Sequence, residues 1–264
     1  MKTALTIAGS DPSGGAGIQA DIKTMSVCGA YAMSVVTALT VQNTTGVFEI
    51  CEVSPELIGK QLDCVFTDIY PDAVKIGMVC SAETADMITE KLCCYHARNI
   101  VVDPVMVSTS GSSLQQEGTL ESMKKGLFRM ADLLTPNIPE ASSLAGIRIE
   151  NDADRMKAAE MIGNQYGCAV LCKGGHSIHG ADDVLYHKGM FRWFYGEWIQ
   201  NSNTHGTGCT LSSAVAAGMA KGMELEDAVL FAREYLIGAL KATLDLGHGN
   251  GPLNHIWNLG GKEN

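Results

Sequence analysis

The segment Asn203-Thr204-His205-Gly206-Thr207-Gly208-Cys209-Thr210 has the residue types of an anion-binding turn. It directly precedes an apolar run, Leu211 to Ala217, that is typical of a helix. Gly206 and Gly208 allow the backbone N–H groups around Thr207 to turn toward one point, where the helix N-terminus adds positive potential. Such a hole would stabilise the charge that develops on a phosphoryl group during its transfer. The alternative is an ordinary glycine turn before a helix.

Cys209 is placed in the first turn of this predicted helix. The helix dipole and the exposed N–H groups there favour thiolate over thiol, so we expect a lowered pKa. A hydroxyl nucleophile must lose its proton as a new O–P bond forms, and Cys209 is predicted to accept it. The competing interpretation is a cysteine that only fills space.

A second glycine-rich segment, residues 8–21, lies between a predicted strand and a predicted helix. Its spacing matches neither the G-x-x-x-x-G-K-[ST] phosphate loop nor G-x-G-x-x-G. It offers a surface that a flat substrate can approach closely. Asp21 is either a polar contact to that substrate or an acid in the first turn of its own helix.

The elements that must position these residues alternate between strand and helix. Polar residues stand at or just after three predicted strand ends, at Asp103, Asn137 and Lys173, where open parallel sheets bind ligands. A hairpin turning at Gly189 is expected to add antiparallel strands at one edge. We predict one doubly wound α/β domain over residues 1–264, with a mostly parallel sheet flanked by helices. The predicted strands span residues 3–8, 31–39, 74–76, 100–103, 132–135, 170–173, 184–188 and 190–194, and the helices span about 18–29, 54 onward, 81–95, 210–220 and 225–244.

The overall composition excludes several classes of protein. The 264 residues carry a net charge of −10 without a basic cluster, which argues against nucleic acid as a partner. The apolar start is too short for a signal peptide, and no run reaches the length of a membrane span, so we expect a cytoplasmic protein. The nine cysteines are an odd number without paired CxxC spacing, which indicates reduced thiols.

Together these segments resemble the hydroxymethylpyrimidine and phosphomethylpyrimidine kinases of thiamine biosynthesis, within the ribokinase-like superfamily. The resemblance runs nearly end to end and implies a ribokinase-like fold, ATP and Mg²⁺ as cofactors, an aminopyrimidine substrate and a homodimer. The motifs that carry it are residues 8–24, Thr40-Val41-Gln42-Asn43-Thr44, Lys75-Ile76-Gly77-Met78, Val102-Asp103-Pro104-Val105-Met106, Thr135-Pro136-Asn137-x-x-Glu140, Lys173-Gly174-Gly175-His176 and the His205 to Cys209 turn.

The resemblance also implies roles for individual residues. A glutamine at the position of Gln42 binds the aminopyrimidine, since its amide can donate to a ring nitrogen and accept from the exocyclic amine. Glu140 and Asp103 would position magnesium, which needs few carboxylates beside nucleotide phosphates. Further residues are implied to line the substrate pocket (Gly9, Asp21, Met78, Val105), to lie at the nucleotide phosphates (Lys173, Asn137, Thr207) and to form the catalytic turn (Gly206, Thr207, Gly208, Cys209). Taken alone, Gln42 would be a loop residue, Glu140 a helix N-terminal acid and Lys173 a solvated side chain.

Two positions depart from what the resemblance leads us to expect. Cys209 stands where many ribokinase-like enzymes carry aspartate, which points to the pyrimidine kinases and some pyridoxal kinases. His248 stands where close relatives carry lysine, which puts a phosphate contact there in doubt.

His176 and His179 have the spacing of a metal pair but no neighbouring carboxylate or cysteine, so we do not expect a site there. The aromatic residues of the hairpin region, Trp193, Tyr195 and Trp198, are expected in the core or at a dimer surface.

Two other functions compete with this interpretation. A pyridoxal kinase would catalyse the same reaction on a pyridine of similar shape, but pyridoxal lacks the exocyclic amine that suits Gln42. A catalytically silent pyrimidine-binding protein would keep the pocket without the residues for phosphoryl transfer, whereas this chain has both sets.

Overall fold

A nine-stranded sheet forms the centre of the computed structural model, which describes residues 1–106, 115–175, 181–196 and 198–259. The strand order is β3-β2-β1-β4-β5-β6-β7-β8-β9. The strands from β2 to β7 in this order run parallel, whereas β3 at one edge and the β8–β9 hairpin at the other are antiparallel. The strand bounds are β1 (Thr3–Ser10), β2 (Tyr31–Asn43), β3 (Gly46–Glu52), β4 (Ala73–Ile76), β5 (Ile100–Val102), β6 (Leu133–Leu134), β7 (Ala169–Cys172), β8 (Asp183–His187) and β9 (Met190–Phe194).

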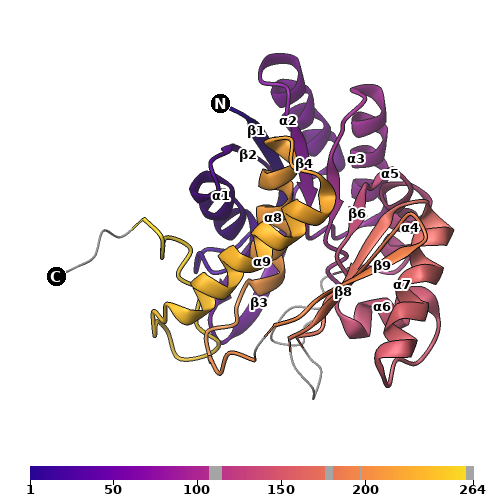
Figure 1. Cartoon of the computed structure of the whole chain (residues 1–264). Coiled ribbons are helices and arrows are strands. Elements are labelled where there is room, and N and C mark those ends of the chain that lie inside the picture. The colour runs from indigo at the N-terminus through magenta and orange to yellow at the C-terminus, as the bar shows by residue number, and fades with distance from the viewer. Residues whose placement is uncertain (107–114, 176–180, 197, 260–264) are drawn as a thin grey trace.

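Helices cover both faces of this sheet (Figure 1). One core contains buried residues of α2 to α7, and the other contains buried residues of α1, α8 and α9. A sheet covered on both faces needs mostly apolar strands, which is why β5 and β7 read as short continuous hydrophobic runs. The helix bounds are α1 (Gly17–Val27), α2 (Pro55–Asp68), α3 (Ala82–Cys94), α4 (Thr119–Lys125), α5 (Leu127–Met130), α6 (Ile138–Ala145), α7 (Asp152–Tyr166), α8 (Thr207–Ala220) and α9 (Leu225–Lys241).

The predicted fold class is confirmed, including the edge hairpin. Gly189 has a φ of +78°, and Lys188 before it also has a positive φ, which allows the tight turn between β8 and β9. Ser54 and Ser81 cap α2 and α3, because each side chain accepts a backbone N–H of the first helical turn. No helix in the described ranges combines the length and the apolar character that crossing a membrane requires.

The sequence did not predict the β2–β3 pair. The predicted strand ended at Leu39, but β2 continues to Asn43 and pairs with β3 through a turn at Thr44 and Thr45. Both central residues of the turn are threonine, so it lacks the Asn-Gly or Asp-Gly pair that marks a tight hairpin. Gln42 is therefore a strand residue.

The carboxyl ends of the parallel strands all lie at the same edge of the sheet. This edge runs across the strands and is distinct from the two edges formed by β3 and β9. Ile7 of β1 pairs with Ile76 of β4, Ile76 with Val102 of β5, and Val102 with Leu134 of β6. The residues that follow these strands are consequently neighbours in space. This edge brings together most of the residues singled out by the sequence.

Candidate active site

Asp103 and Lys173 form an ion pair at the strand ends. The Lys173 ammonium donates to Asp103 Oδ1 over 2.8 Å, and the Thr135 hydroxyl donates to the same oxygen over 3.1 Å. Asp103 is almost fully buried, with 2% of its surface exposed. The predicted placement of both charged residues at the edge of the sheet is therefore confirmed, while their roles stay predictions.

Glu140 lies beside this pair at the start of α6. It forms a capping box with Asn137: Glu140 accepts the Asn137 N–H over 2.8 Å, and Asn137 Oδ1 accepts the Glu140 N–H over 2.8 Å. Burial, reinforced by the negative charge of Asp103 and opposed by Lys173, raises the pKa of the Glu140 carboxyl to about 7. Two carboxyl groups and one ammonium thus share a buried polar cluster.

Replacing Glu140 by glutamine is expected to change how stability depends on pH. A carboxyl whose pKa is raised on folding stabilises the fold at low pH, and this contribution is lost as the pH rises from 4.5 through about 7. Between about pH 5 and about pH 8 the unaltered protein should lose up to about 3 kcal/mol more unfolding free energy than E140Q. Urea denaturation at both pH values measures this, and equal losses in the two proteins would contradict the assignment.

The turn before α8 begins with a glycine in the left-handed conformation. Gly206 adopts a φ of +83° at the N-cap, a conformation that favours glycine. The Thr207 N–H turns back to Thr204 O over 3.3 Å. Within the described ranges, the N–H groups of Gly208 and Cys209 have no acceptor. These two amides are free to bind an anion.

Gly208 places this turn directly against the strand-end cluster. A side-chain carbon at Gly208 would lie 3.2 Å from Asp103 Oδ2 and 3.3 Å from Lys173 Nζ. The free amides and the Lys173 ammonium therefore border the same space. Both are groups that stabilise a phosphate.

Cys209 is half-buried between the N-termini of two helices. The backbone N–H of Gly17, the first residue of α1, favours the thiolate form of this side chain. Burial nevertheless raises the pKa of the thiol to about 11, with Lys75 opposing and the carboxylates of Asp21 and Asp103 adding to the rise. The prediction of a lowered thiol pKa is wrong, because desolvation and two nearby negative charges outweigh the helix N-termini.

Asp21 is buried in an ion pair that the sequence analysis missed. Its carboxylate accepts hydrogen bonds from Lys75 over 2.8 Å, Thr6 over 2.6 Å and Ser213 over 2.7 Å. Lys75 and Asp21 have no exposed surface. The predicted direct contact of Asp21 with substrate is therefore wrong in this structure, since its oxygens face protein donors. A lysine inside the apolar strand β4 was the available signal for a buried charge pair.

Three other predicted pocket residues lie around the same edge. A side-chain carbon at Gly9 would lie 3.1 Å from the sulfur of Met78, so these two residues are in contact. Met78 is half-buried, and its carbonyl accepts the Thr37 hydroxyl over 2.7 Å. Val105, also half-buried, follows β5. Gly9 and Met78 are thus neighbours, while their place in a substrate pocket stays a prediction.

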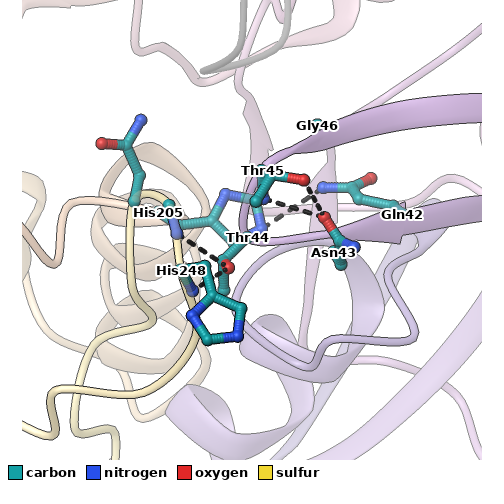
Figure 2. Close-up of a pocket in the computed structure, with 9 residues that line it drawn as sticks. Gln42, Asn43, Thr44, Thr45, Gly46, His205 and His248 are labelled. Carbon is teal, nitrogen blue, oxygen red and sulfur yellow. Dashed lines mark hydrogen bonds between the residues drawn. The ribbon is translucent and has the colours of Figure 1, made fainter.

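Gln42 lies at the wall of a cavity of about 420 Å³ (Figure 2). Its amide points toward His205, with 3.3 Å between the two side-chain nitrogens. His248 also lines the cavity, and its backbone N–H donates to the Thr44 hydroxyl over 3.2 Å. Cys209, Met78 and Val105 are not part of its wall. The cavity is lined by Gln42, Asn43, Thr44, Thr45, Gly46, His205, His248, Gly249 and Asn250.

The remaining sequence candidates are two histidines and three aromatic residues. His176 and His179 fall outside the described residues. Trp193 packs at the border of a hydrophobic core, with the Arg155 guanidinium over its ring at 5.1 Å, whereas Tyr195 and Trp198 are exposed. In the part of the chain that the structure describes, no three His, Cys, Asp or Glu side chains cluster as metal ligands would.

The sequence is similar to proteins of one family along most of its length. The model of the phosphomethylpyrimidine kinase family matches residues 11–254. A thiamine biosynthesis bifunctional protein of Geobacter sulfurreducens is 47% identical over 253 residues, covering 96% of this chain but 52% of that protein, so the chain spans about half of its length. A hydroxymethylpyrimidine/phosphomethylpyrimidine kinase of Staphylococcus aureus is 40% identical over 258 residues, covering 97% of this chain and 94% of that protein.

The fold is similar to solved kinases of two substrate classes. The crystal structure of a phosphomethylpyrimidine kinase from Clostridium difficile 630 superposes with a TM-score of 0.81 at 45% identity, covering 90% of this chain and 98% of that one. An ADP complex of Bacillus subtilis pyridoxal kinase superposes with a TM-score of 0.89 at 33% identity, covering 97% and 98% of the two chains. The sequence is thus more similar to the pyrimidine kinase than to the pyridoxal kinase, whereas the fold superposes well on both.

Proposed function

The chain belongs to the phosphomethylpyrimidine kinase family, with a ribokinase-like fold, and on this premise we propose that it phosphorylates hydroxymethylpyrimidine and its monophosphate with ATP. The product would be the diphosphate used in thiamine biosynthesis. The observation that carries the proposal is the turn from Gly206 to Cys209, whose free amides border Lys173. A single domain, a cytoplasmic location and a homodimer, expected from the sequence, are part of the proposal.

Each group at the edge of the sheet has a role in this reaction. The substrate oxygen forms a bond to the γ-phosphorus of ATP while the bond from that phosphorus to the β-phosphate oxygen breaks. The N–H groups of Gly208 and Cys209, with Lys173, stabilise the charge on the transferring group. The Cys209 sulfur accepts the proton of the substrate hydroxyl. Gln42 binds the edge of the aminopyrimidine.

Asp103 and Glu140 fit a magnesium ion by the chemistry of their donor atoms. Both are carboxylates, and Mg²⁺ typically takes only one or two of these beside waters and substrate phosphates. Burial is the main cause of the raised pKa of Glu140, and a bound cation would favour the ionised form of this carboxyl. When bound, the ion would neutralise charge on the phosphates of ATP.

A pyridoxal kinase is the second candidate, because the fold superposes well on that class. Steady-state kinetics on hydroxymethylpyrimidine, its monophosphate and pyridoxal, with ATP and Mg²⁺ saturating, separates the two. We expect the highest kcat/KM with the pyrimidines. A preference for pyridoxal would overturn the first candidate, and tight pyrimidine binding without turnover would indicate a non-catalytic binding protein.

A further inference from the structure

The hydrogen-bonding role of His205 is fixed by Asp11. His205 Nε2 lies 2.8 Å from Asp11 Oδ2, and both side chains are buried. Burial alone would raise the pKa of the Asp11 carboxyl. Hydrogen bonds from His205, Ser13 and Ala16 outweigh this effect and lower the pKa to about 2. Asp11 is therefore an ionised carboxylate that can only accept. The facing nitrogen of His205 must carry a hydrogen and donate it.

This assignment creates a conflict with Gln42. The nitrogen of the Gln42 amide lies 3.3 Å from the same His205 nitrogen (Figure 2). An amide nitrogen only donates hydrogen bonds, and His205 Nε2 already carries a hydrogen. Two donors face each other, so this contact is not a hydrogen bond.

A second conflict lies at the other atom of the same amide. The Thr40 hydroxyl lies 2.8 Å from the carbonyl oxygen of Ser10 and 3.2 Å from the Gln42 amide oxygen. A hydroxyl has one hydrogen, and the shorter contact to Ser10 takes it, so the Thr40 and Gln42 oxygens face each other without a hydrogen between them. Thr40 and Gln42 lie two residues apart on β2, where side chains share a face of the sheet.

A half turn of the Gln42 amide about its last side-chain bond removes both conflicts. The amide oxygen then lies 3.3 Å from His205 Nε2 and shares its hydrogen with Asp11 as the longer arm of a three-centre hydrogen bond, and the amide nitrogen donates to the Thr40 oxygen while Thr40 donates to Ser10. We propose that His205 and Thr40 fix the Gln42 amide in this orientation and so determine the donor and acceptor order that a ligand meets. The inference rests on the proposed binding of an aminopyrimidine by Gln42.

The fixed amide would select one pattern of ring substituents. Its oxygen keeps a second lone pair and its nitrogen a second hydrogen, and both are available to a ligand. An aminopyrimidine offers an acceptor ring nitrogen beside a donor amine, which matches this order. An analogue with a ring carbonyl in place of the amine offers the reverse order, a donor N–H beside an acceptor oxygen. A freely rotating amide would accept both, whereas a fixed amide rejects the second.

Thr40 provides the test, since valine keeps its shape without the hydroxyl and serine keeps the hydroxyl. We expect the unaltered enzyme to prefer hydroxymethylpyrimidine over its ring-carbonyl analogue in kcat/KM. Thr40→Val should lower this preference about tenfold, the effect of one hydrogen bond, while Thr40→Ser keeps it. The KM for ATP should be the same in all three proteins. A general loss of structure would change this value.

The outcomes separate this inference from the proposed function. If the unaltered enzyme does not phosphorylate hydroxymethylpyrimidine, the proposed function fails. If it does, and Thr40→Val keeps the full preference, the orienting role is overturned.

A measurement on the unaltered protein covers the case in which Thr40→Val does not fold. Nuclear Overhauser effects from the Gln42 amide protons should reach the Thr40 side chain and not the His205 ring. The reverse pattern would overturn the inference.

Discussion

Replacing Cys209 by alanine is expected to lower kcat by about 100-fold to 1,000-fold while the KM values for ATP and pyrimidine change little, which is the usual size of a general-base contribution. In the proposed reaction Cys209, in the first turn of α8, accepts the proton of the substrate hydroxyl. Alanine removes the proton acceptor but leaves the backbone amides. Steady-state kinetics with both substrates varied measures the effect, and an unchanged kcat would exclude Cys209 as the base.

The pH dependence of kcat provides the matched control for this assignment. Since the pKa of the thiol is about 11, the reactive thiolate is a minor form at neutral pH. The kcat of the unaltered enzyme should therefore rise with pH, approaching about tenfold per pH unit below that value if proton transfer limits the rate. Cys209→Asp supplies a base that is ionised at lower pH, so its kcat should depend less on pH. The same slope in both proteins would show that another group controls the rate.

The sequence predicted the strand-end residues well because their placement follows from local patterns. A short apolar run followed by a polar residue identifies a buried parallel strand and its carboxyl end, and the order of such strands brings Asp103, Thr135 and Lys173 together. The glycines at positions 206 and 208 likewise identified the turn before α8 without knowledge of its neighbours. These features depend on a few consecutive residues.

The features that the sequence did not reveal depend on contacts between distant residues. Asp11 and His205 are 194 positions apart, and Lys75 and Asp21 are 54 apart, so no periodicity links either pair. The raised pKa of Cys209 has the same origin, since the burial and the carboxylates that cause it come from other elements. Strand β3 was missed because most of its side chains are exposed at the sheet edge, which leaves no buried pattern to detect.

Replacing Lys75 by methionine is expected to lower the free energy of unfolding by about 3–5 kcal/mol, the usual cost of leaving one member of a buried ion pair without its partner. Asp21 would keep its hydrogen bonds from Thr6 and Ser213 but lose the ammonium 2.8 Å away. The positive charge of Lys75 also opposes the rise in the thiol pKa of Cys209, so K75M should have a lower kcat at neutral pH. Urea denaturation and steady-state kinetics measure the two effects.

Two further variants show whether this cost comes from the unpaired charge. The double variant with Asp21→Asn removes both charges, so it should recover at least half of the lost stability, because most of the penalty belongs to the isolated carboxylate. Lys60→Met breaks the exposed pair with Glu56, whose side chains are 66% and 78% exposed, and should change stability by less than about 1 kcal/mol. A K75M protein as stable as K60M would overturn the assignment of Asp21 and Lys75 as a buried ion pair that stabilises the fold, and with it the charged pair that the structure places near Cys209.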